Sequence, residues 1–199
     1  MQAVQVERFG VENLKVQEVA DPVPGPGEVL IATEAATINP ADLAIVTGTA
    51  APRFPPEAVP PYIPGWDLVG QVAGSADGAD NTMKGVRVVG FTNWFRTGRG
   101  TQASVVALPA ANVVIAPDGL PSAKLTTVGV NGLAAWRGLA DLNLSTGDTL
   151  VITGAAGGVG GFATELAVVR GLTVIAAVRE DARRDAHALG ARWRATAAA

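Results

Sequence analysis

The sequence predicts an α/β protein with an all-β N-terminal part, and three observations lead to that prediction. Residues 1–119 contain many short stretches of alternating or β-branched residues, separated by Gly, Pro and Asn. From residue 120 onward, helical spacing alternates with short apolar runs, and a glycine-rich turn follows the first run. Short strands with such turns are typical of a barrel, whereas a β-α-β-α order is typical of a parallel, doubly wound sheet.

The N-terminal part is expected to hold most of the strands. Strands are predicted at residues 2–8, 14–19, 28–38, 68–73, 87–91 and 102–108. Pro40 at an early helical position predicts a short helix over residues 41–46. Residues 48–64 are rich in proline, so we expect a loop there.

The C-terminal part is expected to begin a parallel sheet. Apolar residues at helical spacing predict a helix over residues 122–140. A strand at 149–153, a helix at 158–170, a strand at 173–178 and a helix at 181–189 follow. Residues 194–199 are low in complexity and give no strand signal. We therefore predict two domains, 1–119 and 120–199, the second with only its first two strands.

Composition excludes several classes of function. The chain has 199 residues, 48% of them hydrophobic, which is enough for a substantial core. A net charge of −3, with acidic and basic residues mixed, argues against a nucleic-acid partner. There is no cysteine, and the single histidine, His187, lies in a polar segment typical of a solvated surface helix. No signal peptide or long apolar run is visible, so we expect a cytoplasmic protein without a membrane partner.

The strongest motif is the sequence TGAAGGVG at residues 153–160. It leaves a predicted strand and opens a predicted helix, where exposed backbone N–H groups can bind the pyrophosphate of a dinucleotide. The alternative, a flexible Gly/Ala linker, fits the flanking strand and helix poorly. The cofactor-binding residues predicted here are Gly154, Ala155, Gly157, Gly158, Val159 and Gly160.

The residues after the second strand of this unit bear on the choice of cofactor. An NAD enzyme usually carries an acidic residue about 20 residues after the turn. Val178 stands at that position here, and Arg179 follows it. A guanidinium group can hold a 2′-phosphate in a bidentate manner, which favours NADPH over NADH. Arg179 could instead be a plain surface charge, and the neighbouring Glu180 and Asp181 weaken the signal.

Four motifs in one order resemble a known family. They are NPAD at 39–42, PGWDLVG at 64–70, VGVNGLAAW at 128–136 and the glycine-rich turn. From residue 1 to about 191, the chain resembles the quinone oxidoreductase branch of the medium-chain dehydrogenase/reductase superfamily, which includes zeta-crystallin. The resemblance implies a GroES-like β-barrel catalytic domain followed by a Rossmann domain, here a partial one because the family's chains are longer.

The resemblance also implies how the chemistry proceeds. The zinc branch of the superfamily carries a cysteine and Gly-His-Glu, whereas this chain has Asn39 in the first region and Gly65, Trp66 and Asp67 in the second. Without Cys or a suitable His, the usual zinc sites cannot form, so no metal is expected. The reaction that remains is hydride transfer from NADPH to a quinone or a conjugated enone.

By resemblance, Asn39 and Asp42 lie beside the nicotinamide and the substrate. Asn39 could orient the carboxamide or donate to the acceptor oxygen, and Asp42 could equally serve to cap the short helix. Tyr62 is a candidate proton donor, although its proline-rich loop favours a packing role. Thr127 is a candidate contact to the nicotinamide end of the cofactor. Three aromatic residues either line an apolar substrate cleft or pack in the core: Phe91, Trp94 and Phe95.

Two other functions remain open at this stage. A doubly wound sheet binds its dinucleotide between the first and fourth strands, and the fourth strand is not predicted here. The first strand is therefore expected at an open edge, which a homo-oligomer or another partner could cover. The chain could accordingly be a truncated, non-catalytic fragment or a binding module. An enoyl-thioester reductase would use the same hydride chemistry.

Overall fold

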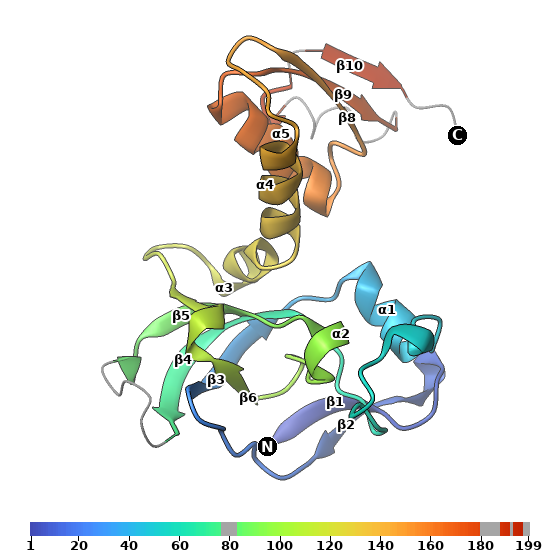
Figure 1. Ribbon diagram of the computed structural model, residues 1–199, viewed down its shortest axis with the longest axis vertical. Helices are drawn as coiled ribbons and strands as arrows, with labels where there is room; N and C mark the ends of the chain where they lie inside the picture. The colour runs from blue at the N-terminus through green and yellow to red at the C-terminus, as the bar shows by residue number, and fades with distance from the viewer. Residues whose placement is uncertain (77–82, 180–187, 192, 197–199) are drawn as a thin grey trace. The chain divides into compact units, whose positions relative to one another are not determined.

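The computed structural model describes residues 1–76, 83–179, 188–191 and 193–196, and these form two compact units. The first unit is Met1–Gly129 and the second is Val130–Ala199. Strands dominate the first unit, and helices accompany a small sheet in the second (Figure 1). The sequence placed the division at residues 119 and 120. The predicted helix over residues 181–189 falls largely outside the described residues.

A five-stranded antiparallel sheet forms the first unit, in the order β6-β3-β4-β5-β7. Its strands are β3 (Glu28–Ala36), β4 (Asp67–Ser75), β5 (Arg87–Phe91), β6 (Val105–Pro109) and β7 (Val113–Ile115). Four of them correspond to predicted strands, and β7 is an addition. Alternate side chains of β3 to β6 point into one apolar core, where Ile31, Leu68, Val88 and Leu108 are at most 2% exposed.

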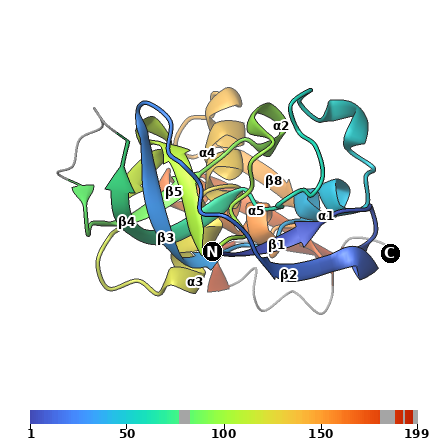
Figure 2. The ribbon, with the colours of Figure 1, turned by 90° about the horizontal axis from the view of Figure 1, so that it is seen from below.

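A separate hairpin begins the chain. It consists of β1 (Gln2–Val6) and β2 (Leu14–Glu18), which run side by side in Figure 2. The Val4 N–H donates to the carbonyl of Gln102, and Val6 exchanges two backbone hydrogen bonds of 2.9 Å with Tyr62. The hairpin therefore fixes the proline-rich loop and the segment that leads into β6.

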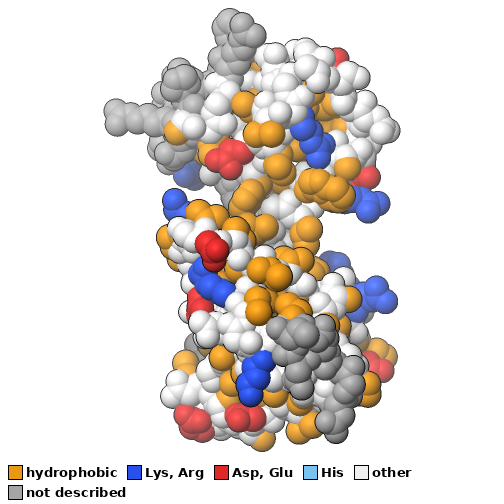
Figure 3. Space-filling view, turned by 90° about the vertical axis from the view of Figure 1, so that its left-hand side faces the viewer, with side chains coloured by type: hydrophobic (Ala, Val, Ile, Leu, Met, Phe, Trp, Pro, Cys, Tyr) orange, Lys and Arg blue, Asp and Glu red, His pale blue; other side chains and the backbone are white. Residues whose placement is uncertain are grey.

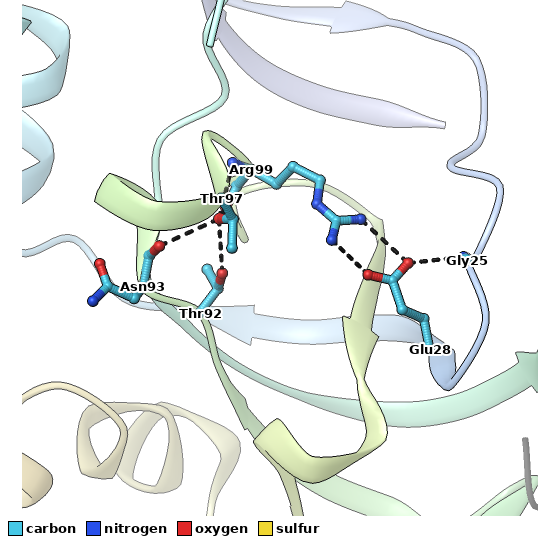
Figure 4. Close-up of polar contacts among 6 residues, drawn as sticks. All are labelled: Gly25, Glu28, Thr92, Asn93, Thr97 and Arg99. Atoms are coloured by element: carbon cyan, nitrogen blue, oxygen red, sulfur yellow. Dashed lines mark hydrogen bonds and ion pairs between the residues drawn. The ribbon is translucent and has the colours of Figure 1, made fainter. Parts of the chain in front are cut away.

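An ion pair joins the start of β3 to the loop before β6. The guanidinium group of Arg99 donates to both carboxylate oxygens of Glu28, at 2.5 and 3.2 Å, and the Gly25 N–H donates to the same carboxylate at 2.9 Å (Figure 4). These donors hold the pKa of Glu28 below its usual range, with the Arg99 hydrogen bonds as the largest cause. In the same view, the Thr97 hydroxyl donates to the Asn93 carbonyl.

Short helices connect the strands of the first unit. They are α1 (Pro40–Val46), α2 (Trp94–Thr97) and α3 (Ser122–Leu125), with 3₁₀ turns at Val11–Asn13, Ala51–Arg53, Ala110–Asn112 and Thr126–Val128. The α3 helix and the 3₁₀ turn after it pack on β3 and β4, which is why they belong to the first unit.

The helix predicted over residues 122–140 is interrupted. Its second part is α4 (Asn131–Asp141), separated from α3 by the 3₁₀ turn and by Gly129. A Cβ atom on Gly129 would lie 2.5 Å from the Cβ of Asp67, so the chain approaches β4 there more closely than any side chain allows. The predicted helix is therefore interrupted at the point where Gly129, whose backbone angles remain helical, packs closely on β4.

The second unit holds a parallel sheet in the order β10-β9-β8. Its elements are β8 (Thr149–Thr153), α5 (Gly158–Val169), β9 (Thr173–Val178) and β10 (Trp193–Thr196). The α5 helix packs on β8, on β9 and on α4, and the core between them includes Ile152, Ala167, Val174 and Ala176. This is the β-α-β arrangement that the sequence predicts.

The prediction of only two strands was wrong, because β10 pairs with β9 in parallel register. Its residues carry no alternating apolar pattern. The unpaired edge of β9 offers backbone hydrogen bonds that do not depend on side-chain type. Among the described residues, β8 is the strand at the opposite edge, as expected, and its central Val151 is 58% exposed.

Candidate functional site

The first set of candidate residues surrounds the start of α1. Asn39 is the N-cap residue with extended backbone, Pro40 occupies the first helical position and Asp42 the third. The side chain of Asp42 reaches back to accept the Asn39 N–H at 2.7 Å, which is one half of a capping box. The sequence NPAD thus determines the local fold, because each residue suits its position in the first turn.

Asp42 also joins α1 to the next motif. Its second carboxylate oxygen accepts the Gly65 N–H at 2.9 Å, and the residue is only 3% exposed. Burial raises the pKa of Asp42, and the two backbone donors oppose that shift without cancelling it. Gly65 has φ of +111°, and a Cβ there would meet the hydroxyl oxygen of Thr101 at 2.4 Å. Asp42 therefore has the capping role that the sequence left open.

Asn39 lies in a buried polar chain with Thr37 and Asp67. The Asn39 amide donates to the Thr37 hydroxyl oxygen at 2.9 Å, and that hydroxyl makes a very short hydrogen bond to the Asp67 carboxylate. The Thr101 hydroxyl donates to the backbone carbonyl of Asp67 at 3.0 Å. Thr37, Asn39 and Asp67 are 9%, 6% and 0% exposed. The motifs at 39–42 and 64–70 therefore meet, as members of one polar cluster.

Tyr62 lies in an aromatic cluster. Its ring stacks on Phe9 at 5.8 Å between centroids and meets Phe54 and Trp94 edge to face. Trp94 is fully buried, and its indole N–H donates to the Ile63 carbonyl at 2.8 Å. These contacts support the packing role for Tyr62 and Trp94.

Phe95 has a different neighbourhood. It meets Trp66 edge to face at 5.1 Å, and the Arg53 guanidinium group lies 4.3 Å from its ring centroid. Phe91 belongs to β5, opposite Asp67 of β4. Phe95 and Phe91 are half-buried, whereas the indole N–H of Trp66 is buried without a hydrogen-bond partner.

The second set of candidate residues is the glycine-rich turn between β8 and α5. Gly154 has φ of +64°, its N–H donates to the Ala177 carbonyl of β9, and its carbonyl accepts the Gly157 N–H, both at 2.8 Å. A Cβ on Gly160 would lie only 2.1 Å from the Gly154 carbonyl oxygen. The first and third glycines therefore meet, as a tight turn with close helix–strand packing requires.

The surface of this turn consists largely of backbone. Gly157, Gly158 and Val159 are exposed at the start of the twelve-residue α5, whereas Ala155 is fully buried in the core of the unit. Exposed N–H groups at a helix N-terminus attract anions, and a phosphate group fits such a surface. The residues present therefore fit a dinucleotide.

Arg179 follows the last residue of β9 and is exposed. Ala177, two residues earlier, pairs with Thr153 of β8 and accepts the Gly154 N–H. Arg179 and the glycine-rich turn consequently lie at the same carboxyl edge of the sheet. Val178, where an acidic residue was sought, is 3% exposed and belongs to the core.

One neighbour of the turn was missed from sequence. The side-chain amide of Asn131 lies 3.2 Å from the position of a Cβ on Gly158, and it comes from the first turn of α4. The VGVNGLAAW motif contains Asn131, whereas the family resemblance pointed to Thr127, directly before the motif. The Thr127 hydroxyl donates to the Lys124 carbonyl at 2.8 Å, and the residue belongs to the first unit.

The donor set does not fit zinc. Trp66 stands between Gly65 and Asp67 where a histidine ligand was sought, and indole is not a ligand for Zn²⁺. Within the described residues, no three His, Cys, Asp or Glu side chains gather closely enough to hold a metal ion.

The distribution of surface charge and the length of the helices bear on nucleic-acid and membrane partners. On the face drawn in Figure 3, described Lys and Arg side chains stand singly or in small groups among hydrophobic and acidic ones. Of the helices that the structure describes, none is long and apolar enough to cross a membrane.

Comparison with known proteins identifies the class. Residues 25–118 match the alcohol dehydrogenase GroES-like domain family. The human quinone oxidoreductase is 32% identical over 178 residues, which are 88% of this chain and 52% of that protein. The quinone oxidoreductase structure from Coxiella burnetii has a TM-score of 0.90 at 26% identity and covers 98% of this chain and 62% of that one.

Residues 25–118 therefore belong to the alcohol dehydrogenase GroES-like domain family, and the chain is similar over nearly its whole length to proteins of the medium-chain dehydrogenase/reductase superfamily, with a GroES-like domain followed by a Rossmann-like unit. Within the superfamily it is similar to the quinone oxidoreductases. The quinone oxidoreductase from Thermus thermophilus, solved alone and with NADPH, gives a TM-score of 0.82 at 28% identity over 98% of this chain and 60% of that one. The chain spans about half to three-fifths of the length of these relatives.

Proposed function

We propose that this protein is an NADPH-dependent oxidoreductase that transfers a hydride to a quinone or a conjugated enone without zinc. The observation that carries the proposal is the glycine-rich turn, where Gly160 packs against the Gly154 carbonyl at a distance that excludes any side chain. Such a turn leaves the helix N-terminus open to a pyrophosphate. The similarity to quinone oxidoreductases supports the substrate class.

The second unit would hold the cofactor. Backbone N–H groups of Gly158 and Val159 would bind the pyrophosphate, and the Asn131 amide lies beside Gly158. The Arg179 guanidinium group would pair with the 2′-phosphate that distinguishes NADPH from NADH. Val178 offers no carboxylate to repel that phosphate or to bind a free 2′-hydroxyl.

The first unit would position the substrate. The bound nicotinamide would supply the hydride. Asn39, held by Thr37 and next to Asp42, would orient the carboxamide or hydrogen-bond the acceptor oxygen as negative charge develops there. Tyr62 remains a candidate proton donor, although its ring contact with Phe9 is structural in kind. Thr127 remains a candidate nicotinamide contact, although its hydrogen bond to the Lys124 carbonyl is also structural.

Calorimetric titration with NADPH and then NADH tests the cofactor proposal. We expect wild-type protein to bind NADPH more tightly than NADH, and Arg179→Ala to lose at least about tenfold of that preference, the equivalent of one charge-assisted hydrogen bond. Arg170→Ala, at the exposed opposite end of α5, is the matched control and should bind like wild type. Equal binding of both cofactors by wild type would contradict the assignment.

A substrate panel separates the reaction classes. Quinones, simple enones and enoyl thioesters would each be mixed with the protein and NADPH. The oxidation of NADPH would be followed by the loss of its nicotinamide absorbance. We expect turnover with quinones or enones. Turnover of enoyl thioesters alone would instead identify the protein as an enoyl-thioester reductase.

The expected cytoplasmic location is a separate prediction, and cell fractionation tests it.

The open edge of β8 favours a second candidate, a self-associating or binding module. Within the described part of the chain, β8 pairs only with β9, and exposed Val151 lies at its centre. An edge of this kind can pair with another strand. A folded, monomeric wild-type protein in light scattering, with NADPH binding, would argue against this candidate.

A further inference from the structure

Gly158 is a glycine that the spacing of the dinucleotide motif does not explain. The spaced glycines of that motif are Gly154, Gly157 and Gly160. Gly158 is the first residue of α5, and its φ lies outside the left-handed region that favours glycine. Within helices, alanine is more favourable than glycine. A contact with another element is therefore the structural reason that remains for a residue without a side chain here.

That contact comes from Asn131, the first residue of α4. The three heavy atoms nearest to a Cβ on Gly158 would be Cγ, Nδ2 and Oδ1 of Asn131, each at 3.2 Å. Nδ2 and Oδ1 are bonded to Cγ at about 1.2–1.3 Å, so no point in the amide plane lies that far from all three atoms at once. The amide group therefore lies flat over Gly158. Its hydrogen-bonding groups lie in the amide plane and do not point at Gly158.

The α4 helix changes character where it reaches the glycine-rich turn. Asn131, Ala135 and Leu139 follow at intervals of four residues and share one face of α4. Ala135 and Leu139 are 3% and 5% exposed, and Leu139 belongs to the core that includes Ala167 of α5. Half-buried Asn131 continues this face with a neutral amide at the first residue of α5. A neutral side chain at this point does not repel a phosphate group, whereas a carboxylate would.

We infer that Asn131 is a positioning residue of the dinucleotide site, which holds the first residue of α5 by packing on Gly158 and adds no charge beside the pyrophosphate. This inference rests on the proposed function, in which the Gly158 and Val159 N–H groups bind the pyrophosphate. Those donors are effective when the first turn of α5 keeps its place and stays uncovered. The contact with Asn131 meets the first condition, and the missing side chain of Gly158 meets the second.

A double-mutant cycle tests the packing contact. Gly158→Ala puts a Cβ against the Asn131 amide, so one of them must shift, and NADPH binding in calorimetry should weaken about tenfold. Asn131→Ala removes the amide, and in that background Gly158→Ala should weaken binding by less than about threefold. Gly161→Ala is the matched control in α5, because a Cβ there meets only Leu189 at 3.6 Å and Ala155 at 4.0 Å. It should leave the affinity of either background unchanged.

Asn131→Asp tests the position of the amide relative to the pyrophosphate. This variant keeps the size of the side chain and adds one negative charge beside Gly158. It should bind NADPH about tenfold more weakly than wild type at about 0.05 M salt, and the difference should disappear near 1 M salt, where ions screen the charge. A loss of packing alone would not depend on salt in this way. Asn143→Asp adds the same charge at an exposed site beyond the opposite end of α4 and should bind like wild type.

The inference is overturned if Gly158→Ala weakens binding equally in both backgrounds, or if Asn131→Asp binds NADPH like wild type at low salt. Thermal unfolding of the same variants reads the contact without cofactor. Gly158→Ala should lower the unfolding midpoint more in the wild-type background than in Asn131→Ala. If that difference appears and wild type binds no NADPH, the proposed function is contradicted and the positioning of the turn by Asn131 stands. NADPH binding without any coupling between the two positions would overturn the inference and leave the proposed function standing.

Discussion

Replacing Asp42 with asparagine leaves one buried backbone N–H without an acceptor. The two Asp42 oxygens accept the Asn39 and Gly65 N–H groups at 2.7 and 2.9 Å, and asparagine has only one oxygen. An unsatisfied buried N–H costs about 1–3 kcal/mol. Removing a carboxylate whose pKa is raised by burial recovers part of that loss. We therefore expect the free energy of unfolding to fall by about 1–2 kcal/mol.

Urea unfolding followed by tryptophan fluorescence measures this change, because fully buried Trp94 reports on the first unit. Asp118→Asn makes the same substitution at an exposed site of the same unit and should stay within about 0.5 kcal/mol of wild type. An Asp42→Asn protein as stable as that control would refute the reasoning that both N–H groups require the carboxylate.

The same carboxyl group predicts the sign of a pH effect. Its pKa is higher in the folded protein than in the unfolded chain because burial disfavours the charge. Its contribution to stability is therefore fully present below the unfolded value, about 3.9, and is lost as the pH rises through the folded value. Asp42→Asn should remove this part of the pH dependence of the free energy of unfolding. A variant with the same pH dependence as wild type would contradict the prediction.

Three further substitutions test the fold. Gly160→Ala would place a Cβ 2.1 Å from the Gly154 carbonyl oxygen. It should therefore destabilise the second unit by about 1–3 kcal/mol and abolish NADPH binding in calorimetry. NADPH binding retained by this variant would contradict the tight turn. Gly138→Ala in α4 meets open space and should gain about 0.5–1 kcal/mol in thermal unfolding, and a loss would show an unseen contact. Glu28→Gln removes the carboxylate that pairs with Arg99. The pKa of that Glu28 carboxylate is lowered in the folded state. The wild-type advantage over it should be full above about pH 4.3 and disappear as the pH falls further, whereas a constant advantage would refute the ion pair as its cause.

Short-range physics explains what could be predicted. The β8 and β9 strands have the predicted bounds, because short apolar runs with turn residues on both sides leave few alternatives. Pro40 and Asp42 suit only the first turn of a helix, and α1 forms there. The glycine spacing at 154–160 likewise predicted a turn that only glycine can form.

Other features depended on residues far apart in sequence. Continuous apolar spacing predicted one helix over residues 122–140, whereas the structure has α3, a 3₁₀ turn and α4 there, with Gly129 packed closely against Asp67. The strand β10 forms because β9 offers an edge, although its own residues give no signal.

The sequence by itself determined the two-part organisation, the glycine-rich turn and the absence of the usual zinc ligands, because each depends on residue types at fixed short spacing. Only the tertiary structure decided that Thr37, Asn39 and Asp67 form one polar chain and that Asp42 serves both α1 and the Gly65 loop. The Thr37–Asp67 and Asp42–Gly65 contacts join residues 30 and 23 positions apart in sequence, and the pairing of β3 with β4 brings the two segments within hydrogen-bonding distance.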